Sequence, residues 1–201
     1  MVWLLISSSM PAHSQTPAEY TVRLPVILQG NEPPLNPVYE GEATWYYADG
    51  SGACSFDPTP EDLMVAAMNE DQWDGSAYCG AYITVSGPLG KVTVRIVDLC
   101  PGCSYWDIDL SEQAFSQIAN LSSGRVPVSW LVVSPELSGP IAYHFKDGSN
   151  QWWTAVQIRN HRNPVASLEF LGDDGEWVNV PRTYYNYFIQ SEPGMGVGPF
   201  T

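Results

Sequence analysis

The sequence is poor in positive charge, poor in histidine, and lacks any apolar run long enough to cross a bilayer. Its 8 Lys and Arg stand against 22 Asp and Glu, a formal net charge of −14. This balance argues against nucleic acids and anionic polymers as partners, whereas neutral glucans would not be repelled. The three histidines lack the spacing of metal ligands. We therefore expect no metal, no cofactor, no nucleic-acid partner and no membrane partner.

The N-terminus carries an apolar run that is too short to span a membrane. It ends in Ala12-His13-Ser14, which resembles a secretory cleavage site after Ser14, although no basic residues precede the run. We expect residues 1–14 to be a signal-peptide remnant and the protein to be secreted, extracellular and monomeric; a frayed apolar tail is the alternative. Residues 15–38 are rich in proline and predict an extended linker.

Residues 39–134 predict a first compact domain. Alternating apolar residues indicate strands at Glu42–Tyr47, Ala81–Ser86, Lys91–Val97 and Pro127–Val133. Two short helices are expected between them. One begins at Thr59-Pro60, with Thr as N-cap and Pro at the first helical position, and the other runs from after Ser111 toward Gly124.

Residues 135–201 predict a second domain without helices. Strand patterns occur at Ile141–Phe145, Trp153–Arg159, Val165–Leu171, Glu176–Val180 and Tyr185–Gln190. A two-sheet sandwich is the natural interpretation, but the region is shorter than the roughly 100 residues of a common sandwich, so we expect it to be C-terminally incomplete. Trp130 and Trp177 are assigned to the cores of the two domains.

The four cysteines allow three pairings. Cys100 and Cys103 form a C-x-x-C, so a local bridge is sterically available, and Cys54–Cys79 would then close a loop worth about 3 kcal/mol. Secretion favours such disulfides. A zinc site using all four thiolates is an alternative that lacks a second C-x-x-C, and a redox dithiol would need a thioredoxin-like context that is missing.

Several segments together resemble a known family. Four resemble the first domain of expansins, most closely the microbial expansins and the cysteine-bearing loosenin-type proteins: GEATWYYADGSGACSFDP, YCGAYITVSGP, VTVRIVDLCPGC and WDIDLSEQAF. Two more resemble the cellulose-binding second domain: QWWTAVQIRNHRNPV and TYYNYF. The resemblance implies an all-β chain, a six-stranded double-psi β-barrel followed by an immunoglobulin-like β-sandwich. It also implies wall loosening without hydrolysis.

The resemblance places the essential acid of the barrel at Asp109. Next to Tyr105 and Trp106 its carboxyl would be desolvated, and the raised pKa would let it donate a proton or a hydrogen bond. The alternative makes Asp109 a helix-entry residue in a capping box with Glu112. Asp107 is interpreted as a solvated neighbour.

Three other positions match the groove of the family. Asp98 matches a second acid, or is simply a turn residue that ends a strand. Thr44 matches a threonine that lines the groove, although most strand threonines are only β formers. Cys100 falls where microbial expansins without these cysteines carry a sugar-contacting tyrosine, and Tyr105 or Trp106 would then supply the aromatic face.

Hydrolysis with inversion needs a second carboxylate about 6.5–9.5 Å from the acid. In the related family-45 endoglucanases that base lies four residues after the strand threonine, which corresponds here to Ala48. Asp49 is one place off and would face the other way in a regular strand, unless a bulge turns it. The sequence therefore predicts a non-hydrolytic protein. A β-1,4-endoglucanase and a lytic transglycosylase acting on peptidoglycan are the alternatives.

The second domain offers a polysaccharide-binding surface. Trp152 and Trp153 are adjacent, so on one strand they point to opposite faces and the core cannot take both. The resemblance adds Tyr185 to these rings and Lys146 as a polar helper, with core packing as the alternative. The predicted partner is cellulose or a related plant cell-wall glucan. We interpret His161 as structural.

Overall fold

The computed structural model describes residues 37–200. The expected signal-peptide remnant, residues 1–14, and nearly all of the linker expected over 15–38 lie outside the described residues. Among the described residues no helix is both long enough and apolar enough to cross a membrane.

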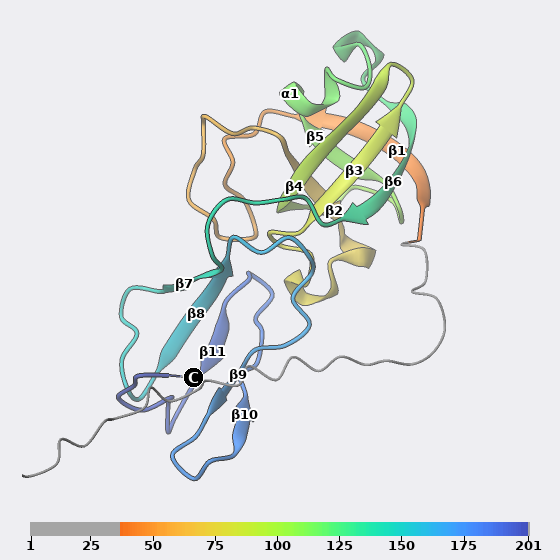
Figure 1. Ribbon diagram of the computed structural model, residues 1–201. Coiled ribbons are helices and arrows are strands. Elements are labelled where there is room, and N and C mark those ends of the chain that lie inside the picture. Colours follow the sequence, from red (N-terminus) through yellow and green to blue (C-terminus); the bar gives the residue numbers. More distant parts are fainter. Residues whose placement is uncertain (1–36, 201) are drawn as a thin grey trace, which may run out of the picture. The chain divides into compact units, whose positions relative to one another are not determined.

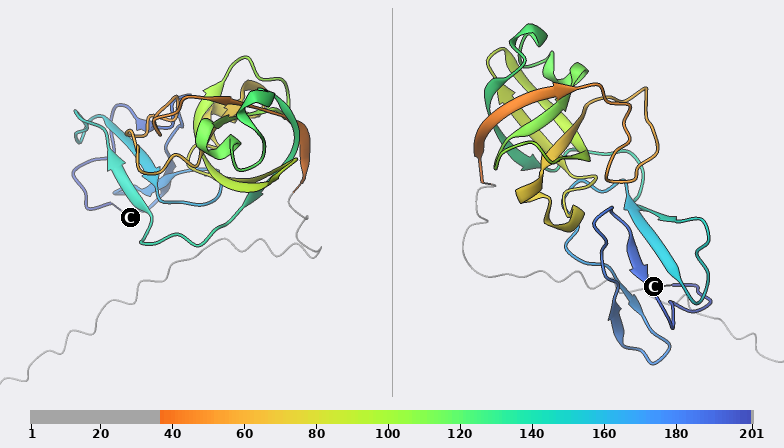
Figure 2. Two further views of the ribbon diagram at one scale, coloured as in Figure 1. Left: turned by 90° about the horizontal axis from the view of Figure 1, so that it is seen from above. Right: turned by 180° about the vertical axis from the view of Figure 1, so that it is seen from behind.

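A closed barrel of six strands forms the first part of the described chain (Figures 1 and 2). Around the barrel the strands follow the order β1-β5-β2-β4-β3-β6, and the pairs β1/β5 and β2/β4 are parallel. The strands are β1 (Tyr39–Tyr46), β2 (Val65–Asn69), β3 (Tyr82–Gly87), β4 (Gly90–Cys100), β5 (Ile108–Ser111) and β6 (Val126–Val133). The predicted six-stranded barrel is confirmed.

The alternation of buried and more exposed side chains explains the long strands of this barrel. In β3 the side chains of Ile83 and Val85 are fully buried while their neighbours are partly exposed, as expected for a sheet with one face on the core. Val94 and Ile96 of β4 and Trp130 of β6 fill the same interior. The prediction that Trp130 lies in a core is therefore confirmed.

The helix predicted at Thr59-Pro60 is wrong. That segment forms turns, in which Thr59 N–H donates to the Asp49 carbonyl at 2.8 Å, and it leads into β2. All five residues of β2 are buried. A strand buried on both faces loses its alternation, so from sequence it cannot be told apart from a buried helical segment.

The helix predicted after Ser111 exists but is short. Helix α1 spans Glu112–Phe115, with the Ser111 hydroxyl accepting from Ala114 N–H at 3.0 Å as its N-cap. The remaining helical pieces in the described chain are single 3₁₀ turns, η1 (Glu70–Gln72), η2 (Asp74–Ser76) and η3 (Leu121–Ser123). Gly124 ends η3 with a φ of 65°.

Two small antiparallel sheets form the second part of the described chain. One has the order β11-β8-β7 and the other pairs β10 with β9. The strands are β7 (Ala142–Phe145), β8 (Thr154–Arg159), β9 (Glu169–Leu171), β10 (Trp177–Asn179) and β11 (Phe188–Gln190). Val156 of β8, Phe170 of β9 and Phe188 of β11 pack into one core, as predicted for a sandwich.

Trp177 does not belong to that core. Its side chain is 58% exposed, so the assignment made from sequence is wrong. In a three-residue strand at the edge of a two-stranded sheet, alternation turns Val178 inward against Phe170 and leaves Trp177 outside.

Hydrogen bonds and the ion pair between Arg159 and Asp57 join the two parts of the chain. The Cys54 carbonyl accepts from Gln157 Nε2 at 2.9 Å and from Asn186 Nδ2 at 3.1 Å. Trp73 Nε1 donates to the Tyr184 carbonyl at 3.1 Å. These bonds satisfy buried polar groups on both sides, so we expect them to couple the stability of the two parts.

Both expected disulfides are present, Cys54–Cys79 and Cys100–Cys103. No cysteine of the described residues is free. The alternative of a zinc site built from four thiolates is therefore wrong.

Candidate functional site

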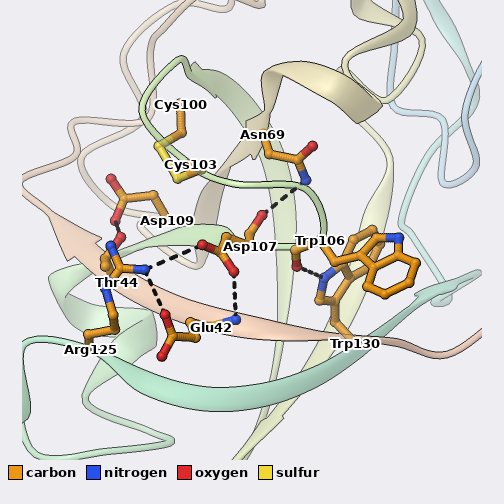
Figure 3. A network of polar contacts seen from close by, with 10 residues as sticks. All are labelled: Glu42, Thr44, Asn69, Cys100, Cys103, Trp106, Asp107, Asp109, Arg125 and Trp130. Atoms are coloured by element: carbon orange, nitrogen blue, oxygen red, sulfur yellow. Dashed lines mark hydrogen bonds and ion pairs between the residues drawn. A yellow bond between two sulfur atoms is a disulfide. The ribbon is translucent and has the colours of Figure 1, made fainter.

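Thr44 and Asp109 meet because β1 and β5 run parallel in one register. The two residues are direct partners across this pair of strands, and the Thr44 hydroxyl donates to Asp109 Oδ1 at 2.6 Å (Figure 3). The two positions are 65 residues apart in the chain. Only the closure of the barrel brings the threonine of the first strand to the acid.

The Asp109 carboxyl is half-buried, and its pKa is raised mainly by this burial. The Asp98 charge raises it further, while the Thr44 hydrogen bond and the Arg125 charge act in the opposite direction. The capping-box alternative is wrong, because Ser111 and not Asp109 caps helix α1. Asp109 is thus a strand residue whose carboxyl favours the protonated form more than an ordinary aspartate does.

Asp98 lies within β4, two residues before the strand ends at Cys100, and is held by backbone groups. Its Oδ1 accepts from Ala53 N–H at 2.7 Å and from Leu99 N–H at 2.8 Å. Gly52 permits this approach, since a Cβ there would lie 2.5 Å from the Asp98 Cβ. The alternative that Asp98 is a turn residue is wrong, because it lies within β4 and pairs with Ala67 of β2. The loop that packs on Asp98 fixes the direction of its carboxylate.

Tyr46 is a member of this site that sequence reasoning missed. Its hydroxyl is buried and has no hydrogen-bond partner among the described residues. Burial raises its pKa, and the charges of Asp98, Asp109 and Asp49 raise it further, so the phenol keeps its proton and remains a hydrogen-bond donor. The available signal was its spacing of two from Thr44, which places both side chains on one face of β1. We call Thr44, Tyr46, Asp98 and Asp109 the acid site.

Asp107 is buried, and its interpretation as a solvated neighbour is wrong. It is 7% exposed, its Oδ1 accepts from Glu42 N–H at 2.8 Å, and its Oδ2 lies 3.3 Å from Arg125 Nη1. Arg125 also pairs with Glu42 at 3.0 Å (Figure 3). This network anchors the loop before β5 to the first strand, and it places a positive charge near Asp109.

Aromatic rings lie in a row beside this network. The Tyr105 and Trp106 rings are 5.0 Å apart, Trp106 is 6.5 Å from Tyr39, and Tyr39 is 4.4 Å from Trp130. Tyr105 and Trp106 are 53% and 40% exposed, so both present ring surface to solvent. Sequence reasoning named these two as the aromatic face of the barrel.

The backbone of Trp106 is held in an uncommon conformation. Its φ is 72°, and its carbonyl accepts from Trp130 Nε1 at 2.8 Å (Figure 3). Gly41 of β1 makes room for it, because a Cβ there would lie 2.5 Å from the Trp106 oxygen. A positive φ in a bulky residue costs energy and is retained only where the surroundings impose it. The contacts with Trp130 and Gly41 therefore fix the backbone that carries the exposed Trp106 ring.

Ala48, where the family resemblance would put a hydrolytic base, packs its side chain against the barrel core. Asp49 does not follow the alternation of β1, because the strand ends at Tyr46. Asp49 is exposed, and hydrogen bonds from the hydroxyl and N–H of Ser51, at 2.6 and 2.9 Å, lower its pKa. It is an ionised carboxylate whose charge is felt at the Tyr46 hydroxyl.

The aromatics predicted for the second part are not all alike. Trp152 is 61% and Tyr185 42% exposed, whereas Trp153 is half-buried. Asn150 shapes the turn that carries the tryptophans, accepting from Trp152 N–H at 2.9 Å. No ring contact within residues 37–200 joins Trp152 or Trp153 to Tyr185.

Lys146 lies with the tyrosines instead. Its Nζ is 4.9 Å from the centre of the Tyr187 ring, which is itself 6.0 Å from the Tyr185 ring. The second part therefore presents Trp152 on a turn and a Tyr185–Tyr187–Lys146 group. The alternative that both tryptophans pack in the core is wrong for Trp152.

The part of the chain that the structure describes contains no group of three or more His, Cys, Asp or Glu placed to hold a metal. His161 is 8% exposed, and its Nδ1 lies 2.9 Å from the Asn163 carbonyl.

Comparison with known proteins assigns the family. Residues 38–130 match the double-psi barrel family model described as lytic transglycolase. Expansin-YoaJ of Bacillus subtilis is 38% identical over 164 residues, which cover 79% of this chain and 70% of that protein. The chain belongs to the expansin family. Expansin-like protein 2 of Dictyostelium discoideum is 30% identical over 77% of this chain but only 40% of its own length.

Solved expansin structures share the fold of this expansin. The apo expansin of Clavibacter michiganensis matches with a TM-score of 0.75 and 32% identity, covering 82% of this chain and 83% of that one. An aspartate-to-asparagine mutant of the Clavibacter expansin, solved in complex with cellohexaose, matches with the same TM-score and 31% identity. The double-psi barrel followed by a β-sandwich is thus the fold of a microbial expansin.

Proposed function

We propose that this expansin is a secreted protein that loosens cell-wall networks without hydrolysis by binding cellulose or a related plant cell-wall glucan. The observation that carries the proposal is the Thr44–Asp109 hydrogen bond of 2.6 Å in a site where Ala48 occupies the position of the hydrolytic base. The cellohexaose complex of the Clavibacter expansin supports a β-glucan as the ligand class.

In this proposal the acid site grips one glucan chain. The Tyr46 phenol, which keeps its proton, donates to sugar oxygens. Asp109 donates in its protonated form, which its raised pKa favours, and Asp98 accepts from sugar hydroxyls. Tyr105 and Trp106 stack on the apolar faces of the glucose rings. Without an opposed base a water molecule is not activated, so the bound chain is displaced from its neighbours and not cut.

The second part anchors the protein in this proposal. Trp152, Trp153 and Tyr185 stack on glucose rings, with Lys146 donating to hydroxyls. Stacking of a flat ring on an aromatic side chain contributes about 1–3 kcal/mol in the related case of nucleic-acid bases. Exposure of Trp152 and Tyr185 gives two of these rings the access that stacking requires.

Depletion onto crystalline cellulose tests the anchor. Changing Trp152, Trp153 and Tyr185 together to Ala should weaken binding at least tenfold, because two or more stacked rings are lost. Trp177→Ala is the matched control, since it removes an equally exposed indole from the other sheet and should leave binding unchanged. Unchanged binding by the triple variant would remove the anchoring role.

Mechanical weakening of paper or wall strips tests the acid site. Asp109→Asn keeps an oxygen for the Thr44 hydroxyl but replaces the carboxyl O–H donor by a weaker amide N–H donor. We expect it to lose weakening activity while still binding cellulose through the second part. Thr44→Val should show a smaller loss, because Asp109 then lacks its fixed partner. Full weakening by Asp109→Asn would exclude the acid from the mechanism.

Two enzymatic functions compete with this proposal on specific observations. The ionised Asp49 near Tyr46 favours a β-1,4-glucanase, which reducing-sugar release from amorphous cellulose at substoichiometric protein would establish. The description of the matched barrel family favours a lytic transglycosylase, which release of anhydro-muropeptides from peptidoglycan would establish. Absence of both products together with wall weakening is the result we expect.

A further inference from the structure

A second polar site is a cavity of about 230 Å³ that no residue of the acid site lines. Its lining residues come from both parts of the chain. Within the described residues four buried side-chain polar atoms lack a hydrogen-bond partner, and three of them belong to residues that line this cavity. They are Arg95 Nε from β4, Arg159 Nη2 from β8 and His161 Nε2. Buried polar groups are normally paired, so three unpaired nitrogens around one cavity mark a candidate site for a polar ligand.

The charges around the cavity do not balance. Arg159 pairs with Asp57 at 2.8 Å, whereas Arg95 makes no ion pair within residues 37–200. The Arg95 guanidinium lies 5.2 Å from the Phe56 ring centre and makes one long hydrogen bond, 3.4 Å, to the Thr59 hydroxyl. The cavity lining thus holds two guanidinium groups and one carboxylate, an excess of one positive charge, in a chain of net charge −14.

His161 adds a hydrogen-bond acceptor. The Asn163 carbonyl can only accept, so His161 Nδ1 carries the hydrogen of that bond. Burial lowers the pKa of His161, and in the neutral ring Nε2 is then an acceptor. Only glycine fits at position 80, because a Cβ there would lie 2.5 Å from this atom.

We propose that this cavity binds a small oxyanion that also carries a hydrogen on oxygen, such as hydrogenphosphate or a hydroxycarboxylate of the sugar-acid class. The N–H groups of Arg95 and Arg159 donate to the charged oxygens, and His161 Nε2 accepts from the ligand hydroxyl. Since a water molecule takes about 30 Å³, the cavity has room for such a ligand. The bound anion links β4 of the barrel to β8 of the second part.

Thermal unfolding of the full chain tests this site. We compare added phosphate and added glucuronate against chloride at equal ionic strength. A saturable rise in Tm with one of these anions is expected, and the anion that saturates at the lower concentration distinguishes inorganic phosphate from a sugar acid. Arg95→Gln should raise the half-saturating concentration at least tenfold. Arg162→Gln is the matched control, since Arg162 pairs with the exposed Glu136 at 3.6 Å.

A nuclear magnetic resonance titration of the unaltered protein keeps the test decisive if Arg95→Gln does not fold. The ring nitrogen signals of His161 should move saturably with the anion and should not move with chloride at equal ionic strength. No saturable Tm rise and no movement of the His161 signals would overturn the proposal. An equal rise of the half-saturating anion concentration in Arg95→Gln and Arg162→Gln would also overturn it, because such a result indicates general charge screening.

Discussion

The barrel and the second part of the chain bury the apolar faces of their sheets in different ways. The barrel sheet closes on itself around a core cluster of 23 buried residues, whereas the second part packs two open sheets over a core cluster of five. Closure removes edges and leaves the barrel strands little freedom to shift in register. The small open sheets leave several rings at the surface, among them Tyr143, Phe145 and Trp177.

Under the proposed function, this difference gives the two parts different work. A carboxyl that must stay at hydrogen-bond distance from Thr44 needs a rigid support, which the closed barrel provides. Flat rings that meet a polysaccharide surface need exposure, which the open sheets provide. The cost of exposure is a small core, and the hydrogen bonds to the Cys54 carbonyl compensate by tying the second part to the barrel.

Removal of a core ring should give the largest contrast. Phe115→Ala in the barrel, where the ring is 0% exposed, should lower the free energy of unfolding by about 3–5 kcal/mol. Phe170→Ala in the second part should cost less, about 2–3 kcal/mol, because its ring is 7% exposed and the smaller core can relax around it. Urea denaturation measures both. Equal losses would contradict the difference drawn between the two cores.

The two disulfides should differ next. Replacing Cys54 and Cys79 by Ala opens a closure of 25 residues and should cost about 3 kcal/mol. Replacing Cys100 and Cys103 opens a closure of 3 residues and should cost about 2 kcal/mol or less. Chemical denaturation under non-reducing conditions compares them. A larger loss for the short bridge would mean that the disulfides act through folded-state contacts and not through loop closure.

The pH dependence of stability should have opposite signs at two acids. The pKa of Asp109 is raised by burial, so its stabilising contribution is complete below its ordinary pKa of about 3.9 and is lost as pH rises through the folded value. Asp109→Asn, which stays neutral, should therefore gain stability over the unaltered protein between pH 3 and pH 7.

Asp57 is the matched control, because the hydrogen bond and charge of Arg159 lower its pKa. Its contribution is present above about 3.9 and is lost as pH falls, so Asp57→Asn should lose stability at pH 7 and lose none at the lowest pH. Thermal melts of both variants across this range measure the trend. Parallel curves for the two variants would refute the assigned pKa directions.

The smallest effect is expected at Trp177. Since its ring is 58% exposed, Trp177→Ala should change the free energy of unfolding by no more than about 0.5 kcal/mol. Urea denaturation beside Phe170→Ala checks this. A loss above about 2 kcal/mol would mean that Trp177 packs in the core, and the two cores would then differ less in size.

Long half-buried strands were predictable because alternation is a local pattern. The strand predicted at Ala81–Ser86 differs from β3 (Tyr82–Gly87) by one residue at each end, and the one at Pro127–Val133 lies within β6. Strand β2 was not predicted because its residues are buried on both faces and therefore show no alternation of apolar and polar side chains. That burial exists only once the barrel has closed around the strand. The role of Tyr46 in the acid site was not predicted for a similar reason, because its neighbours Asp98 and Asp109 come from other strands.

The sequence alone determined which side chains are available: the acids Asp98 and Asp109, the exposed-ring candidates, the cysteines and the strand patterns by which the family is known. Tertiary structure alone decided which of them meet. The parallel register of β1 and β5 joins Thr44 to Asp109, and the burial of Asp107 depends on partners 18 and 65 residues away. Hydrogen bonds and charges act over a few ångströms, so pairings between distant positions exist only once the chain has closed.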